Sequence, residues 1–255
     1  MFIGESFIYD GKSSHEMYGL MVVQSSSSLV TQNFGTIRKT ITEKIKNRSK
    51  NYFYGIEDNI LTFTLELAKK FPWTYEERVA VTKWLFQDTY KVFKSEDYPL
   101  EYKCVAVDGE FKNTGFNQGF LKIKFECDAS HPYSPSEICT FDLSNNTLDT
   151  IIELENKSNI LEYYKPQIEI SMKGSTGVKF ENLTDGGRTF ELTNLYDDEV
   201  IFIDNEREIV YSPLSDTRLS NLVDKRFLRL AYGINRIKVT GKSFIEVKSQ
   251  YPMMM

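Results

Sequence analysis

Phe125-Glu-Cys-Asp-Ala-Ser-His-Pro-Tyr-Ser-Pro-Ser136 is the stretch that divides the chain. Apolar residues alternate with charged ones from Leu121 to Cys127, which is the period-two pattern of a half-buried strand. The strand cannot continue far, because Pro132 and Pro135 lack an N–H group and hold the residues before them extended. Tyr133, between the two prolines, can fix the exit by packing. We therefore predict one domain at 1–135, another at 136–255, and an interdomain hinge at His131, Pro132, Tyr133 and Pro135.

The first 135 residues predict an antiparallel β-sheet with one helix. Leu61–Leu67 alternates almost ideally between apolar and polar residues, as a strand does. Thr74 and Glu77 have the spacing of a capping box, and the apolar positions after them predict an amphipathic helix at about 75–93. We expect a strand from Pro99 that turns at Asp108-Gly109, and a second loop at 115–119. The arrangement is α+β: an antiparallel β-sandwich or split barrel with one covering helix.

The residues after the hinge predict strands and turns only. Residues 140–152 are polar and poorly patterned, so we expect a linker that merges into a first strand. Short alternating segments separated by Gly, Asn and Asp follow, and their close spacing predicts an all-β sandwich. The fold class is therefore mainly β. The expected strands are 166–172, 177–180, 188–192, 199–204, 208–211, 227–230, 235–240 and 243–247.

The composition is that of an ordinary globular protein, with 41% hydrophobic and 26% charged residues. The net charge of −5 arises wholly in residues 136–255, because residues 1–135 carry 17 basic and 17 acidic side chains. Neither half has the strongly basic character typical of a nucleic-acid-binding domain. No apolar run approaches the ~20 residues that span a bilayer, so we expect no membrane partner.

The most basic part of the chain lies between residues 37 and 50. Its apolar residues Ile37, Ile41 and Ile45 recur at every fourth position. Two interpretations stay open for the basic residues: a solvated edge strand, in which lysines prevent unwanted pairing, and a surface that binds another protein. The candidate interface residues are Arg38, Lys39, Lys44, Lys46, Arg48 and Lys50.

No group of residues predicts catalysis, a cofactor or a metal. The two histidines, His15 and His131, lack the partners of a catalytic site, and the two Gly-Lys-Ser matches lack the earlier glycine of a phosphate loop. The acidic residues at 197–199 and 204–208 do not follow the order of a calcium loop. The three cysteines (Cys104, Cys127 and Cys139) lack metal-ligand spacing, and we expect a chain made in a reducing cytosol. We therefore expect no enzyme.

Taken in order, several stretches resemble the distal tail proteins (Dit) of siphophages, the bacteriophages with long non-contractile tails. The resemblance covers essentially the whole chain. The stretches that carry it in the first half are Phe7-Ile-Tyr-Asp-Gly11, Gly19-Leu20, Leu61–Leu67 ahead of Trp84-Leu85, Asp97-Tyr-Pro-Leu100, and Phe125-Glu-Cys-Asp through Pro132-Tyr133 in the dividing stretch 125–136, here called the joint. In the second half, Phe202–Val210 and Leu230-Ala-Tyr-Gly-Ile-Asn235 look like the galectin-like domain of that family.

This resemblance implies a structural protein of the tail tip, or baseplate, of the virion that is assembled in the host cytoplasm. The first domain would form a homo-hexameric ring at the end of the tail tube, with galectin-like domains projecting outward. The implied partners are the tail tube protein, the tail-tip (tail-associated) protein, the tape measure protein and a receptor-binding protein. DNA would pass through the ring without specific binding. Residues 136–255 suffice for the sandwich alone, so the long inserted arm of some relatives is not expected.

A conduit for DNA should not have a strongly basic wall, because Lys and Arg contacts to phosphates would hold the polymer. We therefore expect the basic run at 38–50 to face a neighbouring subunit or another tail protein. An alternative function is a carbohydrate-binding module, in which exposed Tyr and Asn of the sandwich recognise a host surface glycan. A third, a cell-wall hydrolase, lacks any visible set of acid, base and nucleophile.

Overall fold

The computed structural model describes residues 5–23, 37–95, 98–214 and 217–254, so Asp97 lies outside the described residues. The packing of the chain divides it into two compact units. The first unit comprises Met1–Ser134 with Met253–Met255, and the second comprises Pro135–Pro252.

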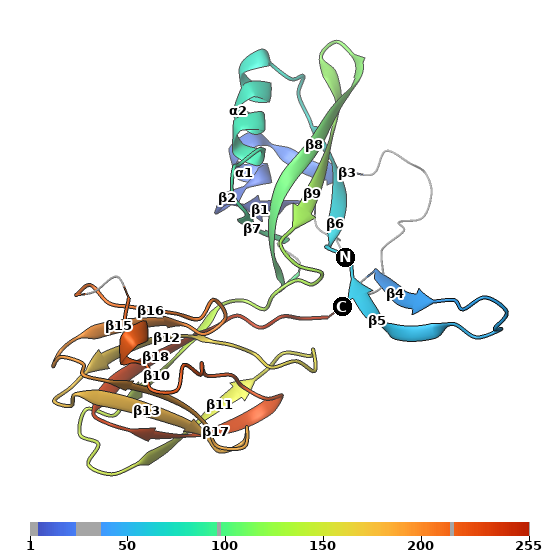
Figure 1. The fold of residues 1–255 in the computed structure, drawn as a ribbon. Helices are drawn as coiled ribbons and strands as arrows, with labels where there is room; N and C mark the ends of the chain where they lie inside the picture. The colour runs from blue at the N-terminus through green and yellow to red at the C-terminus, as the bar shows by residue number, and fades with distance from the viewer. Residues whose placement is uncertain (1–4, 24–36, 96–97, 215–216, 255) are drawn as a thin grey trace. The chain divides into compact units, whose positions relative to one another are not determined.

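The first unit is built on a seven-stranded antiparallel sheet with the order β2-β1-β7-β8-β9-β6-β3 (Figure 1). Two further strands, β4 (Arg38–Glu43) and β5 (Tyr52–Asp58), pair with each other in a sheet of their own. The strands of the large sheet are β1 (Phe7–Tyr9), β2 (Lys12–Ser13), β3 (Leu20–Val23), β6 (Thr62–Lys69), β7 (Lys91–Ser95), β8 (Glu101–Gly115) and β9 (Gln118–Cys127).

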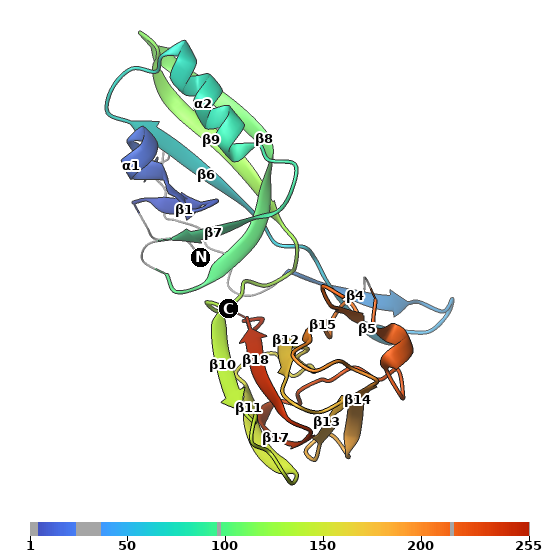
Figure 2. The same ribbon diagram turned by 90° about the vertical axis from the view of Figure 1, so that its left-hand side faces the viewer.

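Aromatic side chains dominate the core of the first unit. The rings of Phe7 and Phe93 stack with their centroids 4.9 Å apart, and those of Phe63 and Phe125 at 5.2 Å. Trp84, from the helix, packs on Phe7 and donates its indole N–H to the carbonyl of Tyr9 at 3.0 Å. Large rings of this kind bury much apolar surface, and a buried indole N–H needs such a partner. The helix is thereby held against the sheet (Figure 2).

The helix begins where the capping box predicts but ends earlier than expected. In α2 (Tyr75–Leu85) the Glu77 amide donates to the Thr74 hydroxyl, and the Thr74 amide donates to the Glu77 carboxylate. The prediction of a helix to about 93 is wrong, because Lys91–Ser95 is strand β7 between β1 and β8. Phe93 is buried there while Val92 is exposed, so pairing with two strands overrides the continued helical spacing. A short helix, α1 (Ser14–Tyr18), precedes β3.

The turn predicted at Asp108-Gly109 is also wrong. Strand β8 continues to Gly115, and its register with β9 shifts by a β-bulge between Ala106 and Asp108. A Cβ atom at Gly109 would lie 3.0 Å from the ring of Phe86, so a glycine here allows close packing rather than a turn. The chain reverses instead within the predicted loop at 115–119, where Phe116 and Asn117 have positive φ.

The second unit is a β-sandwich, as predicted, and the mainly β fold class is confirmed. A five-stranded antiparallel sheet, β10-β18-β12-β15-β16, and a four-stranded one, β11-β17-β13-β14, share one apolar core. The strands are β10 (Glu137–Asp142), β11 (Thr150–Asn156), β12 (Gln167–Met172), β13 (Gly177–Asn182), β14 (Arg188–Thr193), β15 (Val200–Asp204), β16 (Ile209–Tyr211), β17 (Gly233–Thr240) and β18 (Ser243–Ser249), with a 3₁₀ turn η1 (Leu219–Asn221).

Two expectations for the second unit need correction. The segment 140–152 merges into strand β11 as expected, but its first residues, 140–142, are the end of strand β10 and not a linker. Strand β10 lies at a sheet edge and pairs with β18, and most of its side chains are exposed, so it lacks the alternation that would have revealed it. Residues 227–230 are not a strand, since only Leu230 makes a bridge, to Tyr164.

Candidate protein-interaction sites

The hairpin formed by β4 and β5 exposes large apolar side chains. All six side chains of β4 are exposed, and so are those of β5 apart from Gly55. Ile41 opposes Gly55 and Thr42 opposes Phe53, so Tyr54 is the extra residue of a bulge. Phe53, Tyr54 and Ile56 are 62%, 64% and 51% exposed. An isolated two-stranded hairpin is marginally stable in water, so the exposed apolar side chains make this hairpin a candidate surface for contact with another protein.

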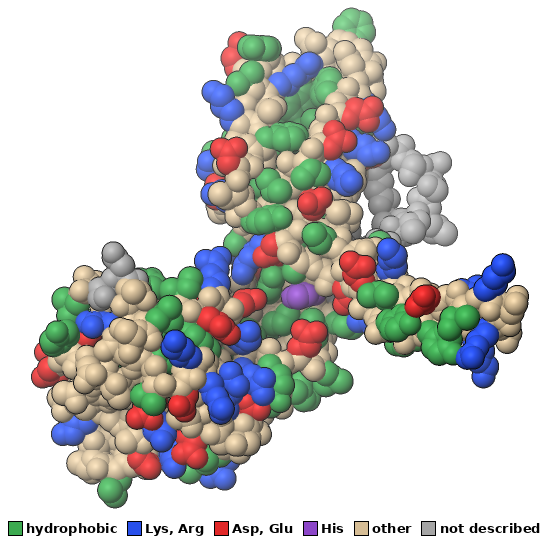
Figure 3. Space-filling model, in the orientation of Figure 1, with side chains coloured by type: hydrophobic (Ala, Val, Ile, Leu, Met, Phe, Trp, Pro, Cys, Tyr) green, Lys and Arg blue, Asp and Glu red, His purple; other side chains and the backbone are tan. Residues whose placement is uncertain are grey.

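The six predicted interface residues all lie on this hairpin. Arg38 forms an ion pair with Asp58 at 3.1 Å, and Arg48 donates to the hydroxyl of Tyr52. The loop at 44–51 carries Lys44, Lys46, Arg48 and Lys50 without an acidic residue. Figure 3 shows basic side chains at the free end of the hairpin and hydrophobic ones along its length. The hairpin thus combines a cationic tip with an apolar stem.

Backbone and ring contacts hold the joint to the first unit as far as Tyr133. Glu101 and Tyr133 exchange two backbone hydrogen bonds of 2.8 Å, and the Tyr133 hydroxyl donates to the carboxylate of Asp128. The ammonium of Lys103 lies 4.4 Å from the centre of the Tyr133 ring, and the ring of His131 meets its edge at 5.2 Å. Burial raises the pKa of Asp128, although Lys103 and Tyr133 oppose the rise.

Of the four predicted hinge residues, Pro132 is buried and its carbonyl accepts the amide of Met253 at 2.9 Å. Pro135 is exposed and is the first residue of the second unit. Pro132 and Pro135 therefore fall on either side of the boundary between the units. Motion about this point stays a prediction.

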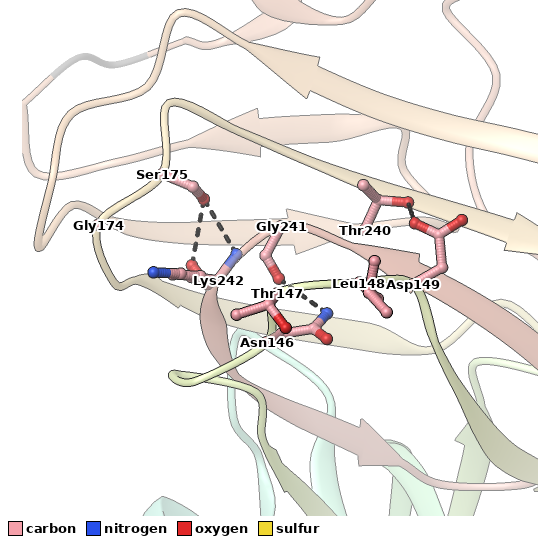
Figure 4. Close-up of a pocket in the computed structure, with 9 residues that line it drawn as sticks. All are labelled: Asn146, Thr147, Leu148, Asp149, Gly174, Ser175, Thr240, Gly241 and Lys242. Atoms are coloured by element: carbon pink, nitrogen blue, oxygen red, sulfur yellow. Dashed lines mark hydrogen bonds between the residues drawn. The ribbon is translucent and has the colours of Figure 1, made fainter.

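A hollow of about 750 Å³ lies at one end of the second unit, between the loops at 146–149, 174–175 and 240–242 (Figure 4). Its polar groups largely satisfy one another: Asn146 donates to the carbonyl of Gly241 at 3.2 Å, and Ser175 and Lys242 are hydrogen-bonded. None of its nine lining residues is aromatic, so it offers no ring on which a sugar could stack. The hollow gives the carbohydrate-binding alternative no support.

Within the described residues, no cluster of three or more His, Cys, Asp or Glu side chains could hold a metal ion. The same part of the chain contains no helix long and apolar enough to cross a membrane.

Sequence reasoning identified the cations of the hairpin but missed the apolar side chains of β5. The available signal was the run Tyr52-Phe-Tyr54. Consecutive aromatic residues in a strand point to both of its faces, whereas a strand on the surface of a core needs them on one face only.

Two family models match this chain almost end to end. Residues 2–129 match a model described as the phage tail protein N-terminal domain, and residues 131–251 match one described as the phage tail C-terminal domain. The chain belongs to this family of phage tail proteins. It is also 24% identical, over 96% of both chains, to the SPbeta prophage-derived protein YomH of Bacillus subtilis strain 168.

Solved structures share the fold of this phage tail protein. The Dit protein of SPP1, described as a paradigm of the hub adsorption apparatus in phages that infect Gram-positive bacteria, matches with a TM-score of 0.72 and 13% identity over 96% of this chain and 98% of that one. A chain of the phage P2 baseplate in its activated conformation matches with a TM-score of 0.56 and 11% identity, over 95% and 97%. The predicted resemblance is therefore confirmed: this is a phage tail component with the fold of a Dit hub protein.

Proposed function

We propose that this phage tail protein is the hub at the distal end of the tail, in which six copies of the first unit close into a ring. The fold shared with SPP1 Dit over nearly the whole chain supports this role. The second unit, as a galectin-like sandwich, stands outside the ring and holds a receptor-binding protein. The ring joins the tail tube protein to the tail-tip and tape measure proteins, and DNA passes through it. The role involves no catalysis and places the protein at the virion tail tip after assembly in the host cytoplasm.

The β4–β5 hairpin is the observation that carries the ring. Its exposed Phe53, Tyr54 and Ile56 and its lack of further strand partners among the described residues call for a covering surface. In a closed ring every copy presents the same hairpin to the same patch of its neighbour, so one contact repeated six times covers the hairpin of every copy. We infer that the stem packs on the adjacent copy and that the cationic tip meets a neighbouring subunit or another tail protein.

The oligomeric state of the purified full chain tests this proposal. We expect a hexamer in light scattering and native mass spectrometry; a strict monomer at high protein concentration contradicts the proposal. The double variant Phe53→Ala/Ile56→Ala removes about 1–2 kcal/mol per covered side chain, so dissociation should become at least tenfold easier. Its midpoint of thermal unfolding as a monomer should not change, because both side chains are exposed in the monomer.

A matched control lies in the second unit. Tyr232 and Ile234 are 61% and 59% exposed, close to the values for Phe53 and Ile56. The variant Tyr232→Ala/Ile234→Ala should assemble like the wild type, since the ring is formed by the first unit. Equal weakening by the two double variants would contradict a specific role for the hairpin stem.

The orientation of the cationic tip has a separate test. Replacing Lys44, Lys46, Arg48 and Lys50 by Gln should weaken assembly or partner binding and reduce its dependence on salt, because exposed ion pairs are screened by salt. If the tip lined the channel, the same variant would instead alter only the retention of DNA. A hexamer structure with all six basic residues of the hairpin in the lumen would refute the proposed orientation.

A further inference from the structure

Cys104 and Cys127 lie directly opposite each other on adjacent strands of the first unit. Cys104 is in β8, Cys127 is the last residue of β9, and the two are register partners. Their side chains are fully buried, with 0% and 1% exposure, and belong to the same core. All three cysteines are free thiols, and Cys139, in β10, is exposed.

The backbone hydrogen bonds show which kind of cross-strand pair this is. The amide of Cys127 donates to the carbonyl of Leu61, the residue before β6, at 2.9 Å and so points away from β8, while the amide of the next residue, Asp128, donates to the carbonyl of Lys103 at 2.9 Å. Because successive residues of a strand direct their backbone groups to opposite neighbours, Cys104 and Cys127 form a non-hydrogen-bonded pair. In such pairs the Cα atoms lie about 4.5 Å apart and the side chains are close. That separation falls within the range of about 4.4–6.8 Å that disulfides span.

The surroundings of Cys104 favour its neutral form. A hydrogen bond with the Cys127 thiol, followed by burial, raises the pKa of the Cys104 thiol far above its usual range. The Cys104 side chain is therefore held as a neutral thiol opposite Cys127, and a disulfide between them requires an oxidant and a closer approach of the two sulfurs.

We propose that Cys104 and Cys127 form an oxidisable dithiol that closes into a disulfide across β8 and β9. A small disulfide such as glutathione disulfide supplies the oxidant. One cysteine thiolate attacks it, forms a mixed disulfide and releases one thiolate; the second cysteine then attacks the mixed disulfide and releases the other. Two protein thiols are oxidised by two electrons, and two glutathione thiols take up both the electrons and the protons.

The location of Cys104 and Cys127 determines when the disulfide can form. A buried neutral thiol reacts slowly, because the thiolate is the nucleophile. Cys127 ends its strand and lies before the hinge residues His131–Pro135, so local opening of the strand end, or folding itself, gives access. Disulfides persist outside the reducing cytosol. A tail protein that leaves the cell within a phage particle makes that transition, and the bond would then tie the base of the long β8–β9 hairpin.

The test uses the full chain with Cys139→Ser, which removes bonds between molecules. The protein is refolded from urea in glutathione buffers of graded redox ratio and quenched with acid. Disulfide content is measured by intact mass, as a loss of two mass units, and by mapping of the linked peptides. A parallel set stays in urea. We expect the bond to survive a buffer at least tenfold more reducing when the protein is native, because the fold holds the sulfurs together.

A displaced pair of cysteines provides the matched control. Val105 and Glu126 are the next register partners and form a hydrogen-bonded pair, in which the two side chains lie farther apart than in a non-hydrogen-bonded pair. Val105→Cys/Glu126→Cys, in a chain whose own cysteines are serines, should gain less from folding. The proposal is overturned if the Cys104–Cys127 disulfide forms at the same redox ratio in the native protein and in urea. It is also overturned if folding stabilises the disulfide of the displaced pair as much as that of Cys104 and Cys127.

Discussion

Arg218→Met should destabilise the second unit by about 3 kcal/mol at neutral pH, because it leaves a buried carboxylate without its counter-ion. The Arg218 guanidinium lies 2.7 Å from an oxygen of Glu199, and the side chains of the two residues are 11% and 0% exposed. The amide of Tyr196 donates to the other oxygen at 2.9 Å and remains in the variant. Removal of one partner of such a pair costs about 3–5 kcal/mol, and the remaining hydrogen bond places this case at the lower end.

The cost should depend on pH. Burial alone would raise the pKa of Glu199, but the bonds from Tyr196, Ser212 and Arg218 outweigh it, so the pKa lies below its usual value of 4.5. A lowered folded-state pKa contributes stability above the pKa of the unfolded chain, and that contribution is lost as pH falls through the folded-state pKa. Without Arg218 the carboxyl takes up a proton more readily. The destabilisation should therefore be largest near pH 7 and shrink as pH falls below about 4.5.

Urea unfolding with two probes measures this effect. Both tryptophans, Trp73 and Trp84, belong to the first unit, so tryptophan fluorescence reports that unit while circular dichroism reports both. The Arg218→Met variant should shift the transition of the second unit alone. As a control, Lys173→Met removes an ion pair with Asp198 whose side chains are 42% and 76% exposed, and it should cost much less stability than Arg218→Met. Equal costs for the two variants, or a cost independent of pH, would refute the reasoning.

Three further variants test local features by thermal unfolding. Gly119→Ala should destabilise the first unit, because the added Cβ would lie 2.2 Å from the carbonyl oxygen of Lys112; an unchanged midpoint would show that the hairpin can shift at no cost. Thr74→Ala removes one half of the capping box and should cost about 1 kcal/mol, with Thr74→Ser close to the wild type. Gly241→Ala should destabilise the second unit more than Gly174→Ala, since both have positive φ but only Gly241 would bring a Cβ within 2.5 Å of a backbone oxygen.

The strands of this protein were predictable where one face alone is buried. Leu61–Leu67 and Leu121–Cys127 alternate because each lies with one side on the core, and β6 and β9 form there. The start of α2 was predictable for a similar reason, since the bonds between Thr74 and Glu77 are made within four residues. The end of the helix was not predictable, because Val92 and Phe93 are in a strand whose partners, β1 and β8, are formed by other parts of the chain.

The candidate interface shows the same division. The sequence alone located the cations at 38–50 and left open whether they belong to a solvated edge strand or to a binding surface. The tertiary structure places them on a hairpin whose strands pair only with each other among the described residues, beside exposed aromatic side chains. Likewise, the sequence showed Cys104 and Cys127 as two apolar strand positions, and only the register of β8 and β9 sets them opposite each other.

By itself, the sequence determined the mainly β class, the period of most strands and the first turn of the helix, because these depend on neighbouring residues and on whether a face is apolar. The tertiary structure alone decided where the helix ends, that Asp108-Gly109 lies within a strand, that residues 137–142 pair at a sheet edge, and which side chains stay uncovered. These outcomes depend on strands far away in the chain, and local periodicity does not indicate which distant strand is the pairing partner.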